Sequence, residues 1–481
     1  MLFNSFEYLL FLPIVFLLYW FVFYKKPAWQ NLLVLCSSYF FYGWWSWKFL
    51  GLLVFGTILD YSFGFGVASQ NPKKAKFFLW FSIINNLGIL GFFKYYNFFA
   101  IQVRAGLGLL GLHTNPFLLH IALPLGISFY TFHGLSYIFD IYRGKQKPVK
   151  NFIDYAVFIS FFPLLVAGPI ERAGHLLPQV QKARRFSYTQ AVEGSRLLLW
   201  GLFKKIAIAD TLARSVDLIF SNYHNYNALT LILGSVAFSF QIYADFSGYS
   251  DIAIGTAKMM GFELFSNFRF PYFSRDIAEF WRRWHISLSS WFRDYLYIPL
   301  GGSRKGRLKA VRNVMIVFLV CGFWHGASWN YIAWGFIHTL GFIPLLLLRR
   351  NRLNSNEIVA YDRKLPRLKE LWQMCATFTF ITFALVFVRA NGIHPALGYL
   401  KHIAESALHQ PSQLLRLPGQ LITLAFICPL VAADWWLRHD ERKLRTPKNK
   451  VTRYALYFIL TIAIFYSFTC NTNEQFIYFQ F

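Results

Sequence analysis

Long apolar segments alternate with short polar connections along the whole chain. A helix needs roughly 20 mostly apolar residues to cross a hydrocarbon core about 30 Å thick, and about 11 to 13 segments approach that length. These segments are residues 3–23, 28–46, 49–68, 77–94, 118–141, 152–168, 192–209, 227–244, 311–322 continuing through 329–348, 371–388, 419–437 and 453–470. The pattern predicts an all-α polytopic membrane protein.

The composition supports a membrane protein. Of the 481 residues, 56% are hydrophobic and only 15% are charged, which excludes a soluble globular chain of this length. Residues 3–23 carry Glu7 and lack a small-residue cleavage site, so we predict a first spanning helix and not a signal peptide. We predict one membrane domain over residues 1–481, and we expect any chemistry to lie in its core at about 120–348.

The net charge is +26, from 48 Lys and Arg against 22 Asp and Glu. The basic residues gather between the apolar segments, as they do in the cytoplasmic loops of membrane proteins, so no nucleic-acid partner is expected. The same rule, applied to Lys25-Lys26 and to the basic residues 438–453, predicts that both ends of the chain lie outside.

Polar groups are most frequent in residues 241–338. At membrane depth, such groups persist only where they are buried in protein or line a wet cavity. Asp245 and Asp251 directly follow an apolar segment, which predicts a helix end that faces a cavity or the interface. Further along, Ser274 before Asp276 predicts a helix N-cap.

Residues 280–299 have the pattern of one amphipathic helix. Aromatic and apolar residues recur at spacings of three and four, while arginines and a serine recur on the neighbouring stripe. The first set is Trp281, Trp284, Leu288, Trp291 and Tyr295, and the second is Arg282, Ser289 and Arg293. His285 lies one turn before Ser289. Alternatively, such a helix lies in the membrane interface with its arginines at lipid phosphates.

A compact basic turn follows at residues 299–307 and contains Arg304 and Lys305. Its glycines let backbone N–H groups and fixed positive charge approach an anion, although a cytoplasmic loop has the same composition.

His325 is flanked by Gly322 and Gly326 inside an apolar region. These glycines predict a departure from helical backbone that brings His325 close to a substrate or to another helix. A histidine pKa of about 6.5 suits proton abstraction near neutral pH, and His285 offers a second imidazole. An interhelical hydrogen bond is the structural alternative. No spacing places several ligands on one helix face, so we predict no metal site.

Three long motifs stand out at residues 243–255, 280–302 and 322–329, with shorter ones at 124–132, 167–172, 201–210 and 476–481. Together they resemble the membrane-bound O-acyltransferase (MBOAT) family, in particular its bacterial alginate O-acetyltransferase (AlgI-like) branch. One departure is His133, where AlgI-like sequences often carry Gln.

The resemblance implies a ring of tilted transmembrane and re-entrant helices around a central tunnel, in a multi-pass protein of the bacterial inner membrane. It implies that His325 is the key catalytic histidine and that His285 is the second one. AlgI-like proteins move an acetyl group from a cytoplasmic thioester toward an extracytoplasmic polysaccharide, often through a periplasmic SGNH-type partner. For this chain we expect an acetyl or another short acyl group, with acetyl-CoA or an acyl-carrier protein as the donor. No permanently bound cofactor is expected.

We assign His325 as general base, with a transient acyl carrier as the alternative, and His285 or a nearby amide as a group that orients the thioester carbonyl. Candidate contacts for substrate or donor are Trp324, Asn330, Ser289, Arg282, Arg283, Arg304 and Lys305. Candidate structural positions around the cavity are Asp245, Asp251, Gly322 and Gly326.

Two other functions remain open at this point. One is a DltB-like D-alanyl transferase that acts with a carrier protein on teichoic acid. The other is a non-enzymatic polysaccharide transporter or export subunit, which the sequence disfavours because it contains no inverted repeat.

Overall fold

The computed structural model describes residues 1–409 except 114, 121, 167 and 356, and residues 424–470 except 443 and 445. Within these residues 74% are helical and no strand occurs. In this described part of the chain, seven helices are long and apolar enough to cross a membrane, and residues 6–22 and 424–437 form shorter apolar helices. The predicted all-α polytopic membrane fold is therefore confirmed. Ala167, residues 419–423 of one expected span and the motif at 476–481 lie outside the described residues.

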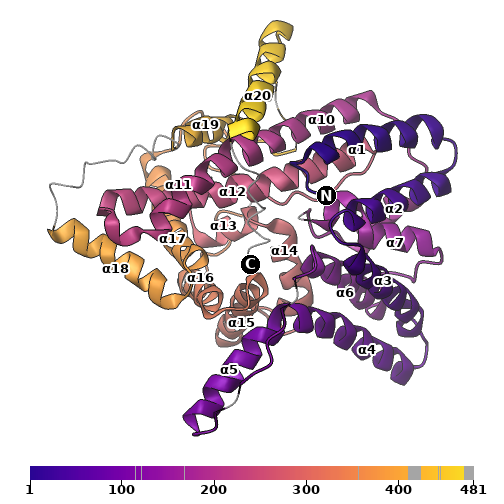
Figure 1. Cartoon of the computed structure of the whole chain (residues 1–481), viewed down its shortest axis with the longest axis horizontal. Helices are drawn as coiled ribbons and strands as arrows, with labels where there is room; N and C mark the ends of the chain where they lie inside the picture. The colour runs from indigo at the N-terminus through magenta and orange to yellow at the C-terminus, as the bar shows by residue number, and fades with distance from the viewer. Residues whose placement is uncertain are drawn as a thin grey trace. The chain divides into compact units, whose positions relative to one another are not determined.

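The chain divides into two compact units, each described here by itself. The first unit comprises residues 1–195 and 253–265, and the second comprises residues 196–252 and 266–481. Helices of the first unit (Figure 1) are α1 (Phe6–Leu17), α2 (Pro27–Gly43), α3 (Trp47–Val67), α4 (Pro72–Leu90), α5 (Tyr96–Leu109), α6 (Ile127–Tyr142), α7 (Phe152–Ser160), α8 (Phe162–Leu165) and α9 (Ala173–Gln181). Helices of the second unit are α11 (Asp210–Ser221), α13 (Ile277–Arg283), α14 (Ile286–Phe292), α15 (Arg307–His325), α16 (Trp329–Leu347), α17 (Leu368–Arg389), α18 (Ile393–His409), α19 (Ile427–Leu437) and α20 (Lys450–Cys470). Two helices, α10 (Tyr188–Leu202) and α12 (Ala228–Met259), contribute residues to both units.

In the first unit, a buried carboxylate joins three helices. Asp60 of α3 accepts hydrogen bonds from Ser82 Oγ at 2.8 Å and from Asn86 Nδ2 at 2.8 and 3.0 Å, both on α4. Gly134 of α6 packs against this group, because a Cβ there would lie 2.3 Å from Asp60 Oδ2. The polar side chains of this apolar bundle therefore satisfy one another inside the protein, as the membrane requires.

In the second unit, α15 and α16 lie side by side (Figure 1) and pack closely through glycines. A Cβ at Gly322 would lie 2.3 Å from the carbonyl oxygen of Tyr331, and one at Gly335 would lie 2.3 Å from that of Phe318. Small residues allow such close approach of membrane helices. The expectation that Gly322 breaks the helix was wrong, because α15 continues to His325; only Gly326 has extended backbone.

This packing predicts that Gly322→Ala lowers the apparent melting temperature of the detergent-solubilised protein. The added methyl meets a backbone carbonyl that cannot yield without separating α15 from α16, and overpacking of this kind costs about 1–3 kcal/mol. Gly88→Ala in α4 is the matched control, since its Cβ would have no atom within 4 Å. Equal melting temperatures for the two variants would contradict the packing argument.

The segment Gln241–Asp251 does not end a helix, as the sequence suggested. It lies inside α12, which continues to Met259. Asp245 is paired there with Lys205 Nζ at 2.8 Å, and Asp251 with Lys204 Nζ at 2.6 Å. The correction has a physical reason: both lysines come from the distant π-helical segment Phe203–Ala209, so the sequence around the two carboxylates does not reveal their counter-charges.

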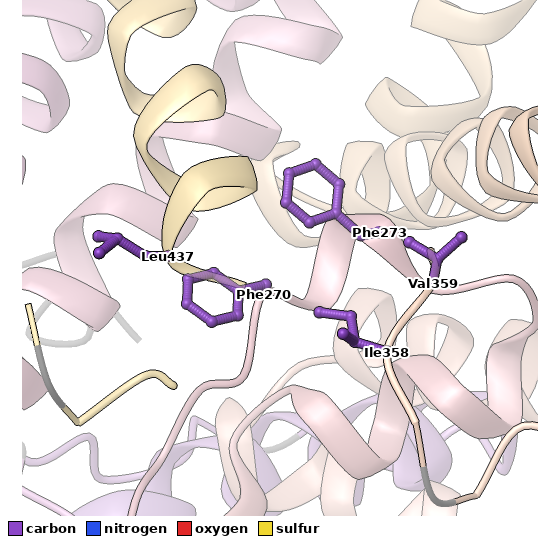
Figure 2. Close-up of a cluster of buried hydrophobic side chains, with 5 residues drawn as sticks. All are labelled: Phe270, Phe273, Ile358, Val359 and Leu437. Carbon is purple, nitrogen blue, oxygen red and sulfur yellow. The ribbon is translucent and has the colours of Figure 1, made fainter. Parts of the chain in front are cut away.

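The connection between α16 and α17 is anchored to the second unit. Ile358 and Val359 are buried with Phe270, Phe273 and Leu437, and Figure 2 shows the five side chains, which come from this loop, from residues 270–273 and from the end of α19. In addition, Arg282 of α13 donates hydrogen bonds to the carbonyls of Asn351 and Asn354, at 2.9 and 3.2 Å. This connection, which had the sequence of an ordinary loop, thus helps to fix α13.

Candidate active site

The helix expected over residues 280–299 is interrupted at His285, so the prediction of one continuous helix was wrong. α13 ends at Arg283 and α14 begins at Ile286, while His285 has left-handed backbone with φ 44° and ψ 53°. A non-glycine residue in this conformation costs of order 1–3 kcal/mol and persists only where its surroundings impose it. The expected aromatic stripe is buried at Trp281, Trp284, Leu288 and Trp291, which argues against a helix lying in the membrane interface.

Asn267 imposes this backbone. Its carbonyl oxygen accepts the Ile286 N–H at 2.9 Å, and its Oδ1 accepts the Ser287 hydroxyl at 2.9 Å. Its Nδ2 donates to Ser250 Oγ of α12 at 3.1 Å. Asn267 is fully enclosed and holds the α14 side of the break that presents His285, while the Arg269 N–H donates to the carbonyl of Arg283 on the α13 side at 2.9 Å. Sequence analysis missed this role, although an Asn amid aromatic residues was a usable indication.

The start of α13 also differs from the expectation, because Asp276 and not Ser274 is the N-cap. Asp276 Oδ1 accepts the Glu279 N–H at 2.7 Å. Buried Glu279 in turn pairs with Arg275 at 3.0 Å and with Arg283 at 2.9 Å. Arg283, a candidate donor contact, is therefore engaged in an ion pair that fixes α13.

His325 ends α15 and is buried beside His285. The ring centroids of the two histidines are 6.2 Å apart, and those of His325 and Trp324 are 4.8 Å apart. The Trp334 ring meets His325 edge-on at 5.2 Å. Burial lowers the pKa of His285 well below its ordinary value, and the nearby His325 lowers it further. His285 is therefore neutral near pH 7 and can donate one N–H to an oxygen atom.

A small cavity of about 20 Å³ lies against His325. Its walls are Ile242, Phe280, Trp284, His325, Tyr331, Trp334, His338, Ile381, Leu385 and Val388. His338, which was not among the predicted site residues, accepts a hydrogen bond from Trp281 Nε1 at 3.2 Å through its Nδ1. The second unit thus brings a third imidazole to the same aromatic cluster.

A larger cavity of about 750 Å³ runs along α15. Among the residues that the structure describes, its lining includes no acidic side chain and six arginines, which are Arg282, Arg293, Arg304, Arg307, Arg349 and Arg352. Ser289 also lines it, so the polar stripe expected on residues 282, 289 and 293 faces this cavity. Cys321, Phe318 and Trp281 line its apolar part.

The remaining candidates lie elsewhere. Lys305 is not part of the lining, although the basic turn that carries it is compact, with positive φ at Gly301, Gly302 and Gly306. Asn330 donates to the carbonyls of Phe387 and Ala390, at 3.0 and 3.1 Å, and so ties α16 to the end of α17. This geometry indicates a structural position for Asn330.

Comparisons with known proteins show which family the chain belongs to. A family model described as MBOAT, membrane-bound O-acyltransferase family, matches residues 145–364, which include His285 and His325. The probable alginate O-acetylase AlgI of Pseudomonas putida is 38% identical over 504 aligned residues, which cover 100% of both chains. The chain belongs to the MBOAT family. It is therefore a membrane acyltransferase.

Other MBOAT relatives differ in name and coverage. A peptidoglycan O-acetyltransferase of Helicobacter pylori is 36% identical over 420 residues, covering 81% of this chain and 77% of the relative. A teichoic acid D-alanyltransferase of Bacillus subtilis is 34% identical over 231 residues, covering 45% and 57%. Family membership sets aside the transporter hypothesis, while the catalytic roles of individual MBOAT residues remain predictions.

The MBOAT site has the parts that acyl transfer requires. It combines a buried imidazole at a helix end, a second neutral imidazole, and a cavity with cationic and apolar parts.

His133, the departure from the AlgI-like pattern, lies in the first unit and accepts the Glu171 N–H at 3.1 Å through its Nε2. That hydrogen bond gives position 133 a structural role within its own unit.

Proposed function

We propose that this acyltransferase takes an acetyl group from acetyl-CoA and delivers it for O-acetylation of an extracytoplasmic polysaccharide. The observation that carries the proposal is the arginine-lined cavity that runs along α15 and reaches Cys321, one helical turn before His325.

The charge of the cavity favours a phosphorylated ligand. Four of its arginines, Arg304, Arg307, Arg349 and Arg352, form no ion pair with a carboxylate anywhere in the described part of the chain. Guanidinium groups bind phosphate through paired, charge-assisted hydrogen bonds. Coenzyme A carries a diphosphate and a ribose phosphate, so these arginines match its nucleotide end.

The length of the cavity also fits such a donor. Arg307 and Cys321 both line it and are 14 residues apart on α15, a helical rise of about 21 Å. An elongated molecule with phosphates near Arg307 would therefore extend its other end toward His325. A thioester at that end suits coenzyme A and also the phosphopantetheine arm of a carrier protein.

In the proposed reaction, His325 takes the proton of the attacking hydroxyl as that oxygen bonds to the thioester carbonyl carbon. The carbon–sulfur bond then breaks, the thiolate takes the proton from the His325 imidazolium, and the free thiol leaves. His285 donates its N–H to the carbonyl oxygen, where negative charge develops in the transition state. No permanently bound cofactor takes part.

The names of the relatives supply the acceptor class. Alginate and peptidoglycan O-acetyltransferases align over most of this chain, whereas the D-alanyltransferases align over about half of it. We therefore place the enzyme in the bacterial inner membrane, passing acetyl to a polysaccharide through a periplasmic SGNH-type partner. Cells that lack the chain should lose base-labile acetate from that polysaccharide; loss of D-alanyl esters instead would favour the alternative.

The donor is tested by calorimetric titration of acetyl-CoA into the purified protein in lipid nanodiscs. We expect Arg304→Gln to weaken binding about tenfold or more, since a hydrogen bond to a charged group contributes about 1.5–3 kcal/mol. Arg185→Gln, at an exposed arginine outside the cavity, should bind as the unmodified protein does. Equal affinity for all three proteins, or binding of an acetylated carrier protein but not of acetyl-CoA, would overturn the assignment of the donor.

A further inference from the structure

The small cavity beside His325 is too small for an ordinary ligand. Its volume of about 20 Å³ exceeds the roughly 10–15 Å³ needed to hold one water molecule, so it accepts a single small group. Apart from His325 and His338, its walls are apolar or aromatic. Such walls favour a methyl group over a water molecule, because water needs several polar partners.

Trp334 indicates that the occupant also has a hydrogen-bond acceptor. Trp334 lines the cavity and is 6% exposed, and its indole N–H is buried with no acceptor among the residues that the structure describes. A buried donor without an acceptor costs free energy and calls for an explanation. A bound carbonyl oxygen would satisfy it at a point next to His325.

One layer of rings separates this cavity from the larger one. Trp281 and Phe318 line the large cavity, while His338 and Trp334 line the small one. Trp281 donates to His338, and the ring centroids of Phe318 and His338 are 6.2 Å apart. A group at the deep end of the donor cavity is therefore one side chain away from the small cavity.

We propose that the small cavity is the acyl pocket and that its size restricts the transferred group to acetyl. The methyl group lies against Ile381, Leu385 and Val388 of α17, and the carbonyl oxygen accepts the Trp334 N–H in addition to that of His285. This inference rests on the proposed function, because it assumes a thioester donor. One additional methylene in a filled apolar pocket is discriminated about 10- to 200-fold, so propionyl would be a poor substrate.

The pocket is tested by competition between equimolar acetyl-CoA and propionyl-CoA, with the ratio of propionyl to acetyl product measured by mass spectrometry. Val388→Ala should raise that ratio about tenfold, because it removes wall atoms at the methyl position. Val386→Ala is the matched control: it is buried on the same helix and does not line the cavity. If Val388→Ala fails to fold, the milder Ile381→Val should move the ratio in the same direction.

A ratio that stays unchanged in active Val388→Ala or Ile381→Val protein would overturn the pocket, and so would an equal rise in Val386→Ala. These results differ from a failure of the proposed function, in which the unmodified protein would transfer neither acyl group from coenzyme A.

The carbonyl contact has its own test. Trp334→Phe keeps an aromatic ring but removes the N–H, so the rate with both thioesters should fall about 10²- to 10³-fold, as for other oxyanion donors. The ratio of propionyl to acetyl should stay as in the unmodified protein. An unchanged rate would overturn the contact, and a changed ratio would mean that Trp334 acts through the shape of the pocket.

Discussion

Replacing His325 with alanine is expected to lower acetyl transfer by about 10²- to 10⁴-fold, the range for loss of a general base. The reason is positional: His325 ends α15, one turn beyond the deep end of the donor cavity, and is packed against Trp334. We expect the second unit to remain folded in the His325→Ala variant, so its acetyl-CoA affinity and melting temperature should stay close to those of the unmodified protein. Base-labile acetate on the polysaccharide of complemented cells measures the effect.

A matched control is available for this variant. His394→Ala removes an exposed histidine of α18 and should leave acetyl transfer unchanged. Full activity of His325→Ala would rule out a chemical role for His325. A short-lived acetyl adduct on His325, detected by mass spectrometry after a rapid quench during turnover, would show that this histidine carries the acyl group and does not act only as a base.

Lys205→Met is expected to have the largest effect on stability. The Lys205 ammonium is completely buried between Asp210 at 2.7 Å and Asp245 at 2.8 Å, and it lies over the Tyr249 ring. Removing it leaves two carboxylates without their shared counter-charge, and breaking a buried pair costs about 3–5 kcal/mol. The yield of monodisperse protein in detergent and its melting temperature should both fall sharply.

Lys401→Met provides the comparison, because Lys401 pairs with Glu405 on the exposed surface of α18 and such pairs contribute about 0–1 kcal/mol. Combining Lys205→Met with Asp210→Asn and Asp245→Asn should restore part of the lost stability, since the buried charges are then removed together. A stable Lys205→Met single variant would show that this network does not support the fold.

The spans could be predicted from the sequence because a helix that crosses hydrocarbon must be apolar along nearly its whole length. The segments expected at 49–68 and 371–388 correspond to α3 and α17 within a few residues. His325 could also be singled out, since an imidazole amid apolar residues is conspicuous wherever it lies.

The break at His285 could not be predicted, since the spacing of apolar residues continues across it without interruption. What interrupts the helix is Asn267, whose hydrogen bonds reach residues that follow it after a turn and another helix. The pairing of Asp245 and Asp251 with two lysines was hidden for the same reason. Local patterns report local backbone preference, whereas these features depend on which distant segments meet.

The layer of rings between the two cavities also bears on the ion gradients across the membrane. These rings are those of Trp281, Phe318, Trp334 and His338. A passage that carries an acyl group toward the outer face would discharge the ion gradients across the bilayer if it were continuously filled with water. Between the two cavities these rings are buried against one another, with the ring centroid of His338 5.0 Å from that of Trp281 and 4.9 Å from that of Trp334. Apolar constrictions stop ions because an ion cannot shed its hydration shell there. We therefore expect this layer, which separates the donor cavity from the acyl pocket, to limit the leakage of ions through the enzyme and so to preserve the proton-motive force.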